Sequence, residues 1–239
     1  MSFHDLTLPE RLLIARRGTA YFAQRLAELV DDDLDGDCLL PGWTHRHLLA
    51  HVGYNAAALC RVLDWAATGI ETPMYTCADQ RNREIGEGAT LNAAALRNLF
   101  DHTVARLNEK WCELPESAWS AEVRTAQGRL VEASETAWMR TREVWIHAVD
   151  LDNGGRFTDF PDDVLDSLLI DIVGMWKKKA LGAGLILSVD GRSSIVVQQE
   201  SSPGGIVSGP LPAVVRWAAG RGSVGVQVEG DIDGPPTWL

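Results

Sequence analysis

Apolar residues recur at helical spacing through the first two thirds of the chain. In the first such stretch they follow Thr7, which has the spacing of a capping box with Glu10, and the stretch ends at the acidic run 31–33. The same criteria predict three further helices, at residues 44–69, 90–114 and 134–152. Four helices with one apolar face each predict a four-helix bundle.

Two segments within this part lack helical spacing. Residues 71–88 are expected to form a loose connection between the second and third helices. Residues 119–133 are expected to form a short extended excursion that turns at Gly128.

The pattern changes after Gly155, where shorter segments follow one another. A further amphipathic helix is expected at 161–179, and a hairpin with its turn at Asp190-Gly191 comes next. The remaining expected elements are short strands at 206–207 and 224–228 and a helix at 211–219. We therefore predict an α+β protein, with a bundle at residues 1–155 and a small mixed α/β domain at 156–239.

The charge balance narrows the classes of partner. The 239 residues carry 33 acidic and 22 basic side chains, a formal net charge of −11. Such an acidic chain is not expected to bind nucleic acid or an anionic membrane, because both need a basic surface. Its apolar runs are shorter than a membrane span, and its first residues lack a signal pattern, so a cytoplasmic protein is expected.

The four cysteines form no recognisable metal or redox motif. No CxxC pair occurs among Cys38, Cys60, Cys77 and Cys112, and the simplest expectation is free thiols in the core. The motifs HExxH, GxSxG and GxxxxGK[ST] are also absent.

The fourth predicted helix carries the most informative polar residues. Glu143 and His147 are one helical turn apart, and Arg140 and Thr136 lie on the same stripe. By itself this spacing is also typical of a surface pair. The neighbouring residues of this helix are largely apolar, so the stripe faces either solvent or a buried site.

The second predicted helix offers a third ligand. His51 lies in the apolar stretch 48–52, where an unpaired imidazole would be costly to bury. One interpretation is a core histidine bonded to a carbonyl or carboxylate. If the second and fourth helices are neighbours, however, His51 meets Glu143 and His147, and two imidazoles with one carboxylate make a catalytic zinc set. His45 and His47 are expected to be exposed, and His47 is a rival ligand because it is one turn from His51.

These motifs resemble a known family. Gly42-Trp43-Thr44 followed by the 48–52 stretch, together with Arg140-x-x-Glu143-x-x-x-His147-x-x-Asp150, is similar to the mycothiol-dependent maleylpyruvate isomerase family. Further similarity lies at residues 54–56, 71–75, 134–136 and 218–223. The resemblance implies a DinB-like metal-binding bundle followed by a small α/β domain over essentially the whole chain.

The resemblance also implies site residues. His51, Glu143 and His147 correspond to zinc ligands, and Arg221 to an arginine implicated in activity. Arg140 and Arg221 are candidates to clamp substrate carboxylates. The residues expected to bind the cofactor are Arg81, Tyr54 and Asn55, and Arg83 is a further candidate in the loose segment.

The activity implied is the cis–trans isomerisation of maleylpyruvate to fumarylpyruvate in gentisate degradation. A thiolate adds to the double bond, the adduct rotates, and elimination returns the thiol. Cys60 is nine residues from His51, about 13 Å along a helix, so it is too far to serve. The resemblance implies that mycothiol supplies the thiol instead. The expected partners are therefore a small anionic substrate and a low-molecular-weight thiol, and the sequence is compatible with a monomer. The alternatives are a mycothiol S-transferase and a zinc-binding regulatory bundle without turnover.

Overall fold

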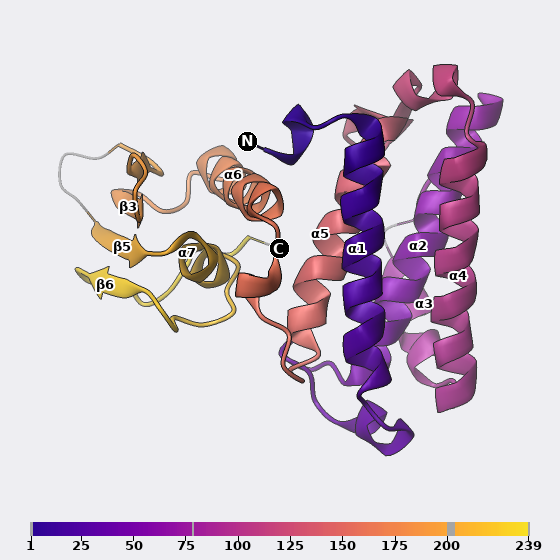
Figure 1. Ribbon diagram of the computed structural model, residues 1–239, viewed down its shortest axis with the longest axis horizontal. Helices are drawn as coiled ribbons and strands as arrows, with labels where there is room; N and C mark the ends of the chain where they lie inside the picture. The colour runs from indigo at the N-terminus through magenta and orange to yellow at the C-terminus, as the bar shows by residue number, and fades with distance from the viewer. Residues whose placement is uncertain (1, 78, 200–203, 239) are drawn as a thin grey trace. The chain divides into compact units, whose positions relative to one another are not determined.

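The computed structural model describes residues 2–77, 79–199 and 204–238. The chain divides into two compact units, one running from Thr7 to Gly155 and the other comprising residues 2–6 with the described residues from Arg156 onward. Helices dominate the first unit and a small sheet with helices makes up the second, which confirms the α+β fold class (Figure 1). Residues 2–6, placed with the bundle in the sequence analysis, belong to the second unit through Phe3, whose N–H donates to Ser167 Oγ.

Four long helices form the bundle (Figure 1). They are α1 (Leu8–Ala27), α2 (His45–Thr68), α4 (Ala93–Glu113) and α5 (Thr136–Asp150). α1 packs against α5 and α2 packs against α4, while α2 also contacts α5. Glu10 accepts hydrogen bonds from the backbone N–H and the hydroxyl of Thr7, so the expected capping box begins α1. Thr44 caps α2, and Gly69 ends that helix in the left-handed conformation at φ 72°.

The segment expected to be loose contains a fifth helix, α3 (Gln80–Ala89), which packs against α2. The sequence signal was weak because Gly86 and Gly88 lower the helix propensity and Ile85 is its one large apolar residue in the core. Gly88 has a packing role, since a Cβ there would lie 2.8 Å from Ala50 Cβ and from Tyr54 Cε2. α3 is therefore held by tertiary contact with α2 rather than by local preference.

The later boundaries of the bundle differ little from those predicted. α4 begins after Asn92, whose side chain accepts from Ala95 N at 2.8 Å, whereas Thr90 ends α3. The predicted extended excursion is a small antiparallel hairpin of β1 (Glu122–Arg124) and β2 (Leu130–Glu132). Gly128 turns it with φ 80°, as expected.

The second unit contains a four-stranded sheet in the order β4-β3-β5-β6. Its strands are β3 (Leu185–Val189), β4 (Ile195–Val196), β5 (Gly205–Gly209) and β6 (Gln227–Glu229), and its helices are α6 (Asp162–Lys178) and α7 (Leu211–Ala218). β3 pairs parallel with β5, and the other two pairings are antiparallel. The expected turn at Asp190-Gly191 is present, with Arg192 N donating to Val189 O. Alternate residues of β3 are buried, which gives this unit its own core.

Short 3₁₀ helices occur at Phe3–Asp5, Asp31–Asp35, Glu116–Ser120, Ala133–Glu135 and Phe157–Asp159. In the described part of the chain, no helix combines the length and the apolar character that crossing a membrane would require.

The cysteines are free, but the expectation that all four lie in the core is wrong. Cys60 is buried and Cys38 half-buried, whereas Cys77 and Cys112 are exposed. Cys77 precedes α3, the element that the sequence analysis missed.

Candidate metal centre

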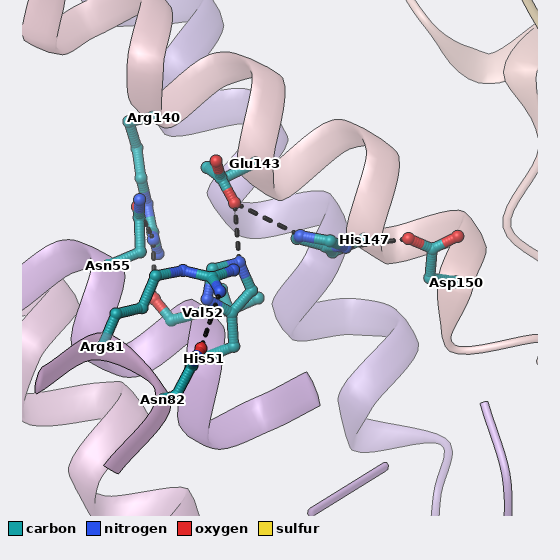
Figure 2. Close-up of polar contacts among 9 residues, drawn as sticks. All are labelled: His51, Val52, Asn55, Arg81, Asn82, Arg140, Glu143, His147 and Asp150. Atoms are coloured by element: carbon teal, nitrogen blue, oxygen red, sulfur yellow. Dashed lines mark hydrogen bonds and ion pairs between the residues drawn. The ribbon is translucent and has the colours of Figure 1, made fainter. Parts of the chain in front are cut away.

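Three potential ligands from two helices converge inside the bundle (Figure 2). His51 comes from the second turn of α2, and Glu143 and His147 come from successive turns of α5. His51 Nε2 lies 2.8 Å from Glu143 Oε2, and His147 Nε2 lies 3.2 Å from the same oxygen. One ligand atom from each residue lies within 4.8 Å of the other two. The imidazole rings face each other edge to face, with 4.9 Å between their centroids.

Asp150 fixes the orientation of one imidazole. His147 Nδ1 lies 2.8 Å from Asp150 Oδ2, which leaves Nε2 directed toward Glu143 (Figure 2). Asp150 is three residues further along α5 and has no exposed surface. In the sequence Asp150 belongs to the motif of the fourth predicted helix, and no role was predicted for it. The signal was its i,i+3 spacing from His147, the distance at which helical side chains meet.

The electrostatics of the triad depend on mutual hydrogen bonding in a buried place. Burial alone would raise the pKa of Glu143, but hydrogen bonds from His147 and His51 outweigh it and hold that pKa well below its usual range. Burial lowers the pKa of His51, against the opposing effect of Glu143. Burial acts in the same direction on His147, yet the hydrogen bonds to Asp150 and Glu143 raise its pKa. Glu143 is thus a carboxylate at neutral pH.

The chemistry of these donors fits a divalent metal. Two imidazole nitrogens and one carboxylate oxygen suit zinc and leave coordination positions for other ligands. The oriented His147 has the arrangement of a histidine ligand whose second nitrogen is held by a carboxylate. His51 and His147 are 4% and 7% exposed, so protein atoms enclose most of the site. The side chain of Glu143 is partly accessible to solvent.

Arg140 lies beside the triad but is enclosed. It has no exposed surface, and its Nη1 donates to Val52 O at 2.8 Å and to Asn55 Oδ1 at 3.0 Å (Figure 2). Its Nε and Nη2 have no hydrogen-bond partner among the described residues. Asn55, expected to bind the cofactor, is buried and uses its amide oxygen on Arg140.

The other residues expected to bind the cofactor belong to the α2–α3 side of the unit. Tyr54 is half-buried and lies against α3 near Gly88. Arg81 is on α3, where its positive charge contributes to lowering the pKa of His51, and its Nη1 lies 3.5 Å from Asn82 Oδ1 (Figure 2). Arg83 is also on α3, and it donates to Cys77 Sγ at 3.6 Å.

Arg221 belongs to the second unit, in the turn after α7. Its Nη1 donates to Ala219 O, and its own carbonyl accepts from Arg216 Nε at 2.7 Å. The flanking Gly220 and Gly222 have positive φ, which places Arg221 on a tightly turned backbone.

The expected exposure of the first two histidines of α2 is wrong. His45 is 7% exposed, and its two ring nitrogens lie 2.8 Å from Asp33 O and 3.0 Å from Leu151 O. His47 is half-buried and completes the cap of α2 through its contacts with the backbone and hydroxyl of Thr44. Both imidazoles are thereby occupied with structural contacts, and His47 is not part of the three-residue cluster.

Comparisons with known proteins agree with this architecture. Residues 15–152, more than half of the chain, match the family described as mycothiol maleylpyruvate isomerase N-terminal domain. Two solved structures described as mycothiol-dependent maleylpyruvate isomerase, one of them a mutant with a histidine replaced by alanine, are each 48% identical to it. Each comparison covers 100% of both chains with a TM-score of 0.97. Among curated protein sequences there is no match.

Proposed function

The chain belongs to the mycothiol maleylpyruvate isomerase family, and from this we propose that it is a zinc- and mycothiol-dependent cis–trans isomerase that converts maleylpyruvate to fumarylpyruvate. The observation that carries the proposal is the convergence of His51, Glu143 and His147 in a chain that matches isomerase structures from end to end. We place the reaction in the cytoplasmic degradation of gentisate.

The reaction requires a temporary loss of the double bond. The sulfur of the thiolate forms a bond to one alkene carbon, and the π pair moves to the conjugated carbonyl oxygen to give an enolate. Rotation about the resulting single bond, followed by return of the electron pair and loss of the thiolate, gives the trans isomer. The thiol is regenerated, so no oxidant or reductant is consumed.

His51, Glu143 and His147 would hold the zinc. When bound, zinc supplies positive charge that favours the thiolate form of a thiol at neutral pH. Asp150 keeps Nε2 of His147 directed at the site, and the low pKa of Glu143 keeps its carboxylate ionised for binding. The chain thus contributes ligands that are already oriented, and Glu143 is already in the ionised form that binds a metal.

Positive charge near the triad suits an anionic substrate. Arg81 is the partly accessible guanidinium whose charge acts on His51, and with Tyr54 it would bind the thiol cofactor or a substrate carboxylate. A role for Arg221 in turnover rests on the family resemblance alone. Arg221→Ala tests this role, and we expect near-normal zinc content with a large fall in turnover.

The number of turnovers per thiol tests the reaction class. The zinc-loaded protein is incubated with excess maleylpyruvate and a small amount of mycothiol, and both acids are followed by NMR. Many turnovers per thiol, with the thiol recovered, support the isomerase. Consumption of one thiol per substrate supports the alternative, a mycothiol S-transferase. Absence of any thiol-dependent reaction, together with unfolding on metal removal, supports a structural zinc bundle.

A further inference from the structure

Arg140 is a buried cation that links the two helices of the metal centre. It lies on α5, one turn before Glu143, and its Nη1 donates to Val52 O and Asn55 Oδ1 on α2 (Figure 2). Val52 directly follows His51, and Asn55 is one turn beyond it. The guanidinium therefore links the backbone next to His51 on α2 with the turn of α5 that comes before Glu143 and His147.

This connection is costly for the stability of the fold. None of the Arg140 side chain is exposed, and its Nε and Nη2 have no hydrogen-bond partner among the described residues. Burial lowers the pKa of Arg140 to about 10, which leaves it cationic at neutral pH, and the charge of Glu143 only partly offsets that effect. An apolar side chain of similar length fills such a space without desolvating a charge. Stability alone therefore does not account for an arginine here.

The burial and the contacts of Arg140 also argue against a role in binding a substrate carboxylate. A clamp presents two parallel N–H groups of its guanidinium to a carboxylate. Nε and Nη2 of Arg140, the pair that could form such a fork, are enclosed and have no exposed surface, and both contacts of Nη1 are with groups of α2. The contacts act instead on the backbone that carries His51.

We propose that Arg140 is a positioning residue that sets His51 of α2 in register with Glu143 and His147 of α5 so that the three ligand atoms converge. The proposal rests on the proposed function for the identity of the metal. Metal sites lose affinity when their ligands are displaced by fractions of an ångström, and losses of supporting contacts typically cost about 10–100-fold.

Three substitutions and one control test this role. Arg140→Met removes the charge and both hydrogen bonds, Arg140→Lys keeps the charge on a single donating nitrogen, and Asn55→Ala removes one acceptor. Arg97→Met is the matched control, because Arg97 on α4 also donates to backbone carbonyls, those of Leu26 and Leu29, away from the triad. Zinc affinity is measured by competition with a chromophoric chelator, and the unfolding temperature of each metal-free protein is measured alongside it.

We expect zinc affinity to fall about tenfold or more in Arg140→Met, by less in Asn55→Ala, and to recover in part in Arg140→Lys. Arg97→Met keeps wild-type zinc affinity, and Arg140→Met lowers the unfolding temperature of the metal-free protein no more than Arg97→Met does. With saturating zinc, kcat of Arg140→Met falls while KM stays within about twofold. If Arg140→Met does not fold, the Lys variant and Asn55→Ala carry the test.

A different pattern overturns the proposal. Unchanged zinc affinity with a raised KM would make Arg140 a substrate clamp. A fall in zinc affinity together with a much larger drop in the unfolding temperature of the metal-free protein than Arg97→Met shows would make its role merely structural. Failure of the proposed function is distinguishable, since a wild-type protein that binds zinc but does not isomerise maleylpyruvate leaves the affinity measurements intact.

Discussion

His147 Nδ1 and Asp150 Oδ2 lie 2.8 Å apart within one turn of α5, and the Asp150 side chain is completely buried. The contact keeps Nδ1–H of His147 on Asp150, so that Nε2, which faces Glu143, is the nitrogen that binds a metal once its proton leaves. A carboxylate in this place also makes the imidazole a more basic ligand. We therefore predict that Asp150→Asn lowers zinc affinity about 10–100-fold without removing the site.

The measurement is chelator competition, with helix content followed by circular dichroism. Asp35→Asn is a suitable control, because Asp35 is an exposed carboxylate that pairs with Arg46 at the surface. Wild-type zinc affinity in Asp150→Asn would show that the second nitrogen of His147 needs no carboxylate.

The ligand set itself makes a stronger prediction. His51→Ala, Glu143→Ala and His147→Ala each remove one of the three converging atoms, so each variant should lose most of its bound zinc and its turnover. The helical signal should change little, because the bundle core is made by other residues. Metal analysis of the purified variants decides the matter, and full zinc content in all three would refute the assignment.

Helical phase explains how much of this site could be predicted. Glu143 and His147 are on one stripe of any helix that contains them, so their proximity follows from the 3.6-residue repeat alone. The place of His51 needed the added assumption that the second and fourth predicted helices are neighbours. The contact between α2 and α5 bears that assumption out, and the three residues do come together.

What could not be predicted depends on contacts between distant residues. His45 can be buried because its two ring nitrogens lie within hydrogen-bonding distance of the carbonyl oxygens of Asp33 and Leu151, which are 12 and 106 positions away in the sequence. α3 is held against α2 by the close approach at Gly88, and local propensity does not register such a contact. The enclosure of Arg140 is of the same kind, since its helical stripe indicates a polar site but not which groups its guanidinium meets.

The reactivity of the cysteines tests the proposal that the reacting thiol comes from mycothiol and not from the protein. Burial raises the pKa of Cys60 to about 11. Desolvation raises the pKa of the Cys77 thiol, but the backbone hydrogen bonds from Gln80 and Asp79 and the charge of Arg83 together outweigh it, so the pKa is lowered on balance. Since the thiolate is the reactive form, iodoacetamide at neutral pH should label Cys77 first and Cys60 last, as read by mass spectrometry.

Cys77 is nevertheless not expected to be the catalytic thiol. We predict that Cys77→Ser retains mycothiol-dependent turnover within about twofold of wild type, because the reacting sulfur comes from the cofactor. Loss of turnover in Cys77→Ser, or turnover of the wild type without any added thiol, would instead indicate a sulfur supplied by the protein.

The close packing of α1 on α5 depends on Gly18. A Cβ at this position would lie 2.5 Å from Trp145 Nε1 and 2.7 Å from Val144 Cγ2. Trp145 has little freedom to move, because it stacks on Tyr21 at 5.2 Å and its Nε1 lies 3.4 Å from Ile14 O. Gly18→Ala should therefore push α5 away from α1 and lower the free energy of unfolding by about 1–3 kcal/mol.

Gly86→Ala is the matched control for this last prediction. Gly86 is also helical, but a Cβ there would meet nothing within 4 Å, so the substitution should be neutral or stabilise the protein by up to about 1 kcal/mol through helix propensity. Urea unfolding of the two metal-free variants compares them directly. Because α5 carries Glu143 and His147, Gly18→Ala should also weaken zinc binding while Gly86→Ala leaves it unchanged. Equal stability of the two variants would mean that α1 and α5 separate without cost, and the bundle would then not be the rigid support that the metal centre requires.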